Sequence, residues 1–202
     1  MMTAVERKRR AGGDNRVRVL DQVVSVLVVR GYERTRFRDV SEASGVAVST
    51  LQGYFGSRED MLIEALQHST TTEVAEMERL AEGFEDPWRR LSALAERGLA
   101  TPVPVWRMLM EFWTAAAHDE ELRRHSERLD ERYRRPFVSA VERGVEAGTF
   151  TPRDSAGAVV DVLIAAMDGL LYPRVLGIGR TPAEDYHRVV MAQLAWSLGV
   201  AE

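Results

Sequence analysis

The chain has 202 residues, of which 45% are hydrophobic, so it can form one large domain or two small ones around a substantial core. It contains no cysteine, which excludes disulfides, thiolate metal sites and cysteine nucleophiles. The longest apolar runs, such as residues 159–167, are shorter than the roughly 20 residues of a membrane span, and no apolar signal-peptide segment follows the basic N-terminus. We therefore expect a soluble, cytoplasmic protein with no membrane partner.

The net charge of −4 is distributed unevenly along the chain. Residues 1–58 contain 11 Lys/Arg and 6 Asp/Glu, a balance of +5, whereas residues 59–202 contain 16 and 25, a balance of −9. A basic front segment is typical of a protein that meets a polyanion, although the split can also arise by chance. Arg7–Arg10, followed by glycines, predicts a disordered basic arm over residues 1–13.

Helical periodicity recurs through the whole chain and no strand pattern interrupts it, which predicts an all-α fold. Nine helices are expected: 15–30, a short one between Thr35 and Gly45, 46–54, 57–80, one opened by Asp86 and Pro87, one through Trp106 to about Ala117, one from about Asp119 to Gly148, 155–172 and 182–198.

Capping signals mark several of these helix ends. Ser57 followed by Asp60 forms a Ser-x-x-acid box, and Pro87 suits the first position of a helix that Asp86 opens. Thr181, Pro182 and Glu184 predict a second capping box at the start of the last helix.

Two short helices joined at Gly45 match a helix-turn-helix, with Val40 and Ala43 packing the first helix and Val46 and Leu51 packing the second. In that geometry the second helix lies in the major groove, where Ser, Thr and Gln can hydrogen-bond base edges or phosphates. The alternative is an ordinary helical hairpin with a solvated face.

The stretch GYERTRFRDVSEASGVAVSTLQGYFGSREDML, residues 31–62, resembles the DNA-binding signature of the tetracycline-repressor (TetR) family. The shared positions are Gly31-Tyr32, Thr35, Asp39-Val40, Ala43, Gly45-Val46, Thr50-Leu51, Tyr54-Phe55 and Ser57-Arg58-Glu59. The resemblance implies a nine-helix TetR-like architecture, with a helix-turn-helix DNA-binding domain over residues 14–56 and a ligand-binding and dimerisation domain over residues 57–202.

The predicted DNA contacts lie in and around the second of the two short helices. Gln52 stands where members of the family usually have an aromatic residue, so it either reads adenine through two hydrogen bonds or is simply solvated. Arg36 stands where they often have Ser or Thr, which puts the cap of the preceding helix in doubt. The predicted contact residues are Thr35, Arg36, Arg38, Val48, Ser49, Thr50, Gln52, Gly53, Tyr54 and Arg58, with Arg36, Arg38 and Arg58 as phosphate partners.

An aromatic and methionine stripe suggests an effector pocket. Trp106, Met110 and Trp113 recur at helical spacing, and such a stripe either fills a core or lines a cavity. The family resemblance favours a pocket for a largely apolar ligand, lined by Phe84, Trp88, Trp106, Met110, Trp113, Phe137, Met167 and Asp168. Asp161 and Asp168 share a helix face, where they either orient a polar or cationic ligand or pair with arginines at a dimer interface.

The helices over residues 155–173 and 182–199 are predicted to form an isologous homodimer interface. The four histidines are far apart in sequence, so we predict no metal site. No catalytic motif frames a nucleophile, so we predict that the protein has no cofactor and is not an enzyme. The leading hypothesis is a ligand-responsive repressor that a small effector releases from a pseudo-palindromic operator. The alternatives are a constitutive DNA-binding protein without an effector and an all-helical enzyme.

Overall fold

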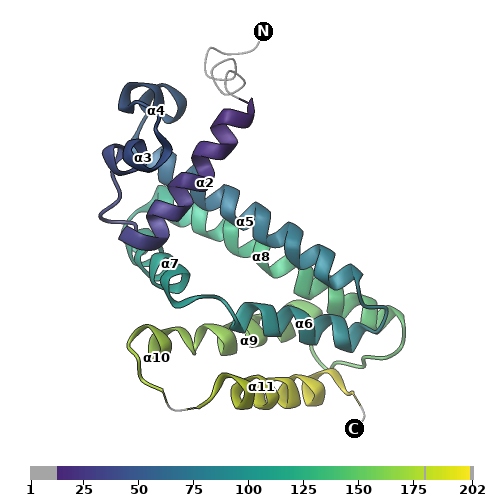
Figure 1. The fold of residues 1–202 in the computed structure, drawn as a ribbon. Helices are drawn as coiled ribbons and strands as arrows, with labels where there is room; N and C mark the ends of the chain where they lie inside the picture. The colour runs from purple at the N-terminus through teal and green to yellow at the C-terminus, as the bar shows by residue number, and fades with distance from the viewer. Residues whose placement is uncertain (1–12, 180, 201–202) are drawn as a thin grey trace. The chain divides into compact units, whose positions relative to one another are not determined.

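The regular structure of the chain is entirely α-helical in the computed structural model, which describes residues 13–179 and 181–200 (Figure 1). The helices are α2 (Gly13–Arg30), α3 (Phe37–Ser44), α4 (Val48–Phe55), α5 (Arg58–Glu82), α6 (Pro87–Leu99), α7 (Val103–Ala116), α8 (Glu120–Glu146), α9 (Ala156–Asp168), α10 (Leu171–Val175) and α11 (Ala183–Leu198). Apart from Gly13, which begins α2, the basic arm expected over residues 1–13 lies outside the described residues.

All nine predicted helices are present, and the predicted all-α class is confirmed. The helix expected over residues 155–172 is interrupted at Gly169 and Leu170, so that α10 is a separate short helix. Pro173 explains the break, because its ring would clash with the carbonyl four residues earlier, at Gly169.

The predicted caps are confirmed at two helices and wrong at a third. The Ser57 Oγ accepts from the Asp60 amide at 3.0 Å, and the Asp86 carboxylate accepts from the Arg89 amide at 3.0 Å. The capping box expected from Thr181 and Glu184 is not formed, because α11 begins directly after Pro182 with no side-chain cap.

The chain forms two compact units, each with its own core. The first runs up to Thr71 and includes Arg107–Glu127; the second comprises Thr72–Trp106 and the chain from Arg128 onward. The first unit is therefore larger than residues 14–56, since it also holds the start of α5 and most of α7. The domain boundaries predicted from the sequence stay a prediction.

In the first unit, the two short helices α3 and α4 pack on a hydrophobic core. The α2 helix packs on α3, and α3 packs on α4. Val23, Leu27, Val40 and Leu51 are completely buried there. Ala43 is exposed, contrary to expectation, so Val40 alone of the predicted pair anchors α3.

The second unit has a core of its own, in which α11 contacts both α9 and α6 (Figure 1). Its fully buried members include Leu94, Phe137, Val160 and Leu198, which come from four different helices. Burial of this apolar surface is the main favourable term that holds these helices together.

Among the described residues, one segment, Ala156–Val175, is long and apolar enough to cross a membrane by length and composition alone. It comprises two helices broken at Gly169, and it carries Asp161, Asp168 and Arg174. Charged groups are expensive inside a bilayer, so this segment is a poor candidate for a span.

Candidate nucleic-acid interface and effector region

The outward face of α4 is free and carries hydrogen-bonding side chains. Ser49, Thr50 and Gln52 are exposed, whereas Leu51 and Phe55 on the opposite face are buried. Hydroxyl and amide groups both donate and accept, so this face can match the donor and acceptor pattern of base edges. The predicted reading face is therefore accessible in the structure.

The start of α3 is capped by Asp39 rather than by the residue that precedes the helix. The Asp39 carboxylate accepts from the Arg36 amide at 2.8 Å, and its other oxygen lies 3.2 Å from the Arg30 Nη1. This resolves the doubt about the cap that Arg36 raised in the sequence. The Arg38 side chain is 83% exposed and meets Glu42 only at 4.0 Å, so it can reach a phosphate.

Arg58 is engaged inside the protein. Its Nε donates to the Thr35 carbonyl at 2.7 Å, its Nη2 donates to the Tyr32 carbonyl, and its guanidinium lies 5.4 Å from the centre of the Tyr32 ring. Burial raises the pKa of Tyr32 to about 12, although the Arg58 charge opposes that rise. The predicted phosphate contact of Arg58 would have to compete with these interactions.

Thr35 is also committed to the protein interior. Its side chain is completely buried and its hydroxyl donates to the Gly31 carbonyl at 2.8 Å. The side chain is therefore not available to DNA in this conformation, and we leave it out of the proposed contacts.

The remaining predicted DNA contacts, Val48, Gly53 and Tyr54, are partly exposed. The Tyr54 ring meets the Phe55 ring edge-on at 6.1 Å. Sequence reasoning missed Arg16, which pairs with Glu64 and lies 5.1 Å above the Phe55 ring. No local motif reveals this residue, because its partners are 39 and 48 positions away along the chain.

The residues predicted to line an effector pocket are divided between the two units. In the second unit Phe137, Met167 and Trp106 are buried, and Phe84 and Trp88 are half-buried. In the first unit Met110 is half-buried and Trp113 is 37% exposed. Phe137 and Met167 belong to the hydrophobic core cluster of the second unit.

The two aspartates of α9 have different surroundings. Asp161 is 61% exposed and pairs with Arg134 of its own chain. Asp168 is half-buried and has no ion-pair partner among the described residues. Burial, followed by repulsion from Asp130, raises the pKa of Asp168 to about 6.

A close contact of three helices lies in the same unit as Asp168. A Cβ added to Gly98 would lie 2.9 Å from the Tyr133 hydroxyl and 3.1 Å from the Met167 sulfur. Burial raises the pKa of Tyr133, with further contributions from Glu73 and Asp168, so its hydroxyl stays protonated and can donate. Asp168 and Tyr133 are therefore candidates for the few polar contacts of an effector.

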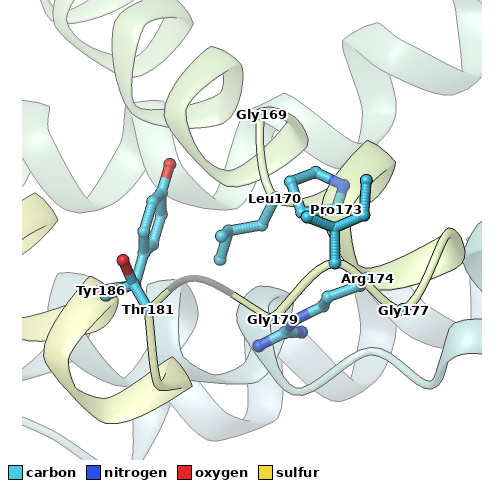
Figure 2. A pocket seen from close by; sticks show the side chains of 9 residues that line it. Gly169, Leu170, Pro173, Arg174, Gly177, Gly179, Thr181 and Tyr186 are labelled. Atoms are coloured by element: carbon cyan, nitrogen blue, oxygen red, sulfur yellow. The ribbon is translucent and has the colours of Figure 1, made fainter.

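Two clefts lie elsewhere in the second unit. One, of about 370 Å³, is formed by the turn after α9, by α10 and the loop that follows it, and by the start of α11 (Figure 2). The other, of about 230 Å³, is lined by Arg90, Arg135 and Arg143 among others. Neither cleft is lined by a residue of the predicted pocket, and the turn predicted at residues 177–179 is the sequence feature nearest to the first cleft. In the described part of the chain no cluster of three or more His, Asp or Glu could hold a metal ion.

The α3 and α4 helices form a helix-turn-helix, and α4 presents accessible hydrogen-bonding side chains. This arrangement is typical of DNA-binding regulators of the helix-turn-helix class. The sequence model described as bacterial regulatory proteins of the tetR family matches residues 19–65. The model described as BetI-type transcriptional repressor, C-terminal, matches residues 87–199, which is more than half of the chain. The chain therefore belongs to the TetR family of transcriptional regulators.

Individual relatives agree with this assignment. The chain is 23% identical over 160 residues to the HTH-type transcriptional regulator YfiR of Bacillus subtilis, which covers 76% of each chain. It is 34% identical over 79 residues to the HTH-type transcriptional repressor KstR of Mycolicibacterium smegmatis, or 39% of each chain.

Solved structures share the fold. FadR from Bacillus subtilis in complex with stearoyl-CoA superimposes with a TM-score of 0.76 at 16% identity, covering 92% of this chain and 100% of that one. A transcriptional regulator from Saccharomonospora viridis in complex with choline gives a TM-score of 0.76 at 22% identity, covering 90% and 95%. At these identities the likeness concerns the fold alone.

The raised pKa of Asp168 predicts a pH-dependent stability. The unfolded carboxyl ionises near its ordinary value of 3.8, whereas the folded one holds its proton to about pH 6. The folded state therefore binds more protons between about pH 4 and pH 6. As a result, the contribution of Asp168 to the free energy of unfolding falls as the pH rises through this range. Asp168→Asn should raise the free energy of unfolding at pH 7 by about 1–2 kcal/mol, after discounting for partial exposure, and by much less at pH 4.

Urea unfolding at both pH values measures this difference. Asp161→Asn is the matched control, because it removes an exposed carboxylate that pairs with Arg134 and should give no such gain. An Asp168→Asn variant that is equally or less stable than the parent at pH 7 would show that burial does not raise the pKa of the Asp168 carboxyl.

Proposed function

We propose that the protein is a cytoplasmic, homodimeric repressor that reads a pseudo-palindromic operator with α4 and releases it when a small effector binds. The observation that carries this proposal is the exposed face of Ser49, Thr50 and Gln52 on a helix whose other face is anchored by Leu51 and Phe55. That arrangement leaves the hydrogen-bonding groups free while fixing the direction in which the helix points.

The proposed DNA contacts follow from accessibility and charge. Gln52, Ser49 and Thr50 read base edges, with Val48, Gly53 and Tyr54 close to the backbone. Arg38, whose side chain is 83% exposed, binds phosphate. Arg36 is also exposed and binds phosphate through the guanidinium N–H groups that its Nη1 bonds to the Glu33 and Thr35 carbonyls leave over. In a dimer, two copies of α4 would lie about 34–36 Å apart, which is one turn of the double helix.

The dimer is supported by exposed apolar side chains on α9 and α11. Val162 is 70% exposed, Val189 is 48% exposed and Trp196 is 76% exposed. Large apolar side chains gathered on neighbouring helices usually mark an interaction surface. We propose that the helices over residues 155–173 and 182–199 bury this surface against the same surface of a second copy.

The effector is proposed to be largely apolar, with a few polar contacts. The fold neighbours were solved with ligands as different as stearoyl-CoA and choline, so the fold does not by itself fix the effector chemistry. The proposed lining in the second unit comprises Phe84, Trp88, Trp106, Phe137, Met167 and Asp168. An effector that favours a dimer with misplaced α4 helices weakens operator binding through a coupling free energy of about 1–3 kcal/mol.

Two substitutions in the first unit test the reading helix. An operator is first selected from a random DNA pool, and binding is then measured over a series of salt concentrations. Arg38→Ala should weaken binding to all sequences and reduce the salt slope by about 1, because one phosphate contact is lost. Gln52→Ala should change the preference at particular base pairs, at a cost of about 1–3 kcal/mol on the parent operator.

Arg79→Gln is the control, because Arg79 is exposed in the second unit, pairs with Glu76 and lies outside the proposed DNA and dimer surfaces. If the Arg38 and Gln52 variants both bind the operator as the parent does, α4 is not the reading helix.

The dimer surface is tested by placing a charge on it. Val162→Asp should shift the protein from dimer to monomer and raise the dissociation constant of the dimer about tenfold or more, since an unpaired charge is costly to bury. Light scattering after size-exclusion chromatography gives the mass. Val145→Glu on α8 is the control, since Val145 is 44% exposed but lies outside the proposed surface. A Val162→Asp protein that remains dimeric would contradict the proposed interface.

A further inference from the structure

Among the described residues, the cleft of about 370 Å³ at the end of α9 combines an apolar wall with one cationic group (Figure 2). Leu170, Pro173, Ile178 and Tyr186 line it, and so does Arg174. In Figure 2 the Tyr186 ring lies on one side, Pro173 on the other, and the Arg174 guanidinium at the edge between them. Its volume falls within the usual range for small-molecule sites, about 300–1,000 Å³.

Arg174 is half-buried and its charge is not balanced by a carboxylate among the described residues. Its Nη1 donates to the Leu99 carbonyl, which fixes the side chain in place. A guanidinium has five N–H donors, so most of them remain for another partner. Such a pre-positioned fork suits a carboxylate, which accepts two parallel hydrogen bonds.

The apolar wall is also held in place. The Tyr186 hydroxyl donates to the Ala166 carbonyl, so the polar end of this side chain is already satisfied and its ring is left to line the cleft. The loop after α10 turns at Gly177, whose φ of 67° favours glycine. This turn lets the Ile178 amide donate to the Pro173 carbonyl at 2.7 Å, which holds the loop against α10.

We propose that this cleft binds an amphipathic carboxylate, with the acid group on Arg174 and the aliphatic chain against Leu170, Pro173, Ile178 and Tyr186. The site is separate from the aromatic set proposed to line the effector pocket, but Leu170, Pro173 and Tyr186 belong to the two segments proposed to form the dimer interface. Binding there does not depend on DNA; only its use as a regulatory signal rests on the proposed function.

Isothermal titration of the full-length protein with three probes of one chain length tests the chemistry. The probes are decanoate, decanol and decyltrimethylammonium, each used below its micelle concentration. Decanoate should bind about tenfold or more tightly than decanol, because only the acid engages Arg174. Equal affinity for decanol, or tighter binding of the cation, would overturn the proposal.

Two variants locate the site. Arg174→Gln should weaken decanoate binding about tenfold or more and leave decanol binding unchanged, whereas Arg79→Gln, which removes an exposed charge on α5, should change neither. Ile178→Trp should weaken both probes by filling the cleft while keeping the charge. Thermal unfolding followed by circular dichroism confirms that each variant is folded. A folded Arg174→Gln or Ile178→Trp protein that binds decanoate as the parent does would overturn the assignment.

Operator binding measured with and without decanoate separates this proposal from the proposed function. Binding that depends on Arg174 but leaves operator affinity unchanged supports the cleft and counts against its regulatory use. Release of the operator by another effector, with no decanoate binding at all, overturns the cleft and leaves the proposed repressor intact.

Discussion

The arrangement of the first unit depends on the guanidinium of Arg58, the first residue of α5. It donates to the main-chain carbonyls of Tyr32 and Thr35 and lies over the Tyr32 ring. These contacts connect the start of α5 to the turn between α2 and α3, across 23 to 26 residues of sequence. Carbonyls in a turn have no helical partner, so a charged donor that satisfies two of them stabilises the turn strongly.

The position of the reading face follows from that turn. The Asp39 carboxylate caps α3 and also meets Arg30 at the end of α2, so the two helices are fixed to each other on both sides of the turn. The α4 helix then packs through Leu51 and Phe55, which directs Gln52 and its neighbours outward. In the second unit, too, an arginine is positioned by a main-chain carbonyl, since one hydrogen bond to Leu99 holds the Arg174 guanidinium in its cleft.

Much of this fold is predictable from sequence because its signals are local. Glycine stops, the Ser57 cap and the Asp86 cap depend on residues within one helical turn, and the nine predicted helices are present. The roles of Arg58 and Thr35 are not predictable in this way. An arginine at a helix start has the same sequence pattern whether it binds phosphate or main-chain carbonyls, and a threonine in a turn has the same pattern whether it is exposed or buried. The cleft at Arg174 was missed because its lining comes from α10, α11 and the turns beside them, which no local pattern brings together.

Hydrogen exchange of the free protein, comparing the parent with Arg58→Gln, tests most directly whether Arg58 stabilises the turn between α2 and α3 and the helices that follow it. We expect amides of the turn and of α3 to exchange about tenfold or more faster in the variant, while those of α11 keep the parent rate. We also expect operator binding to weaken with no change in salt slope. Unchanged exchange in α3, together with a salt slope reduced by about 1, would contradict this role of Arg58, because that combination is the signature of a lost phosphate contact.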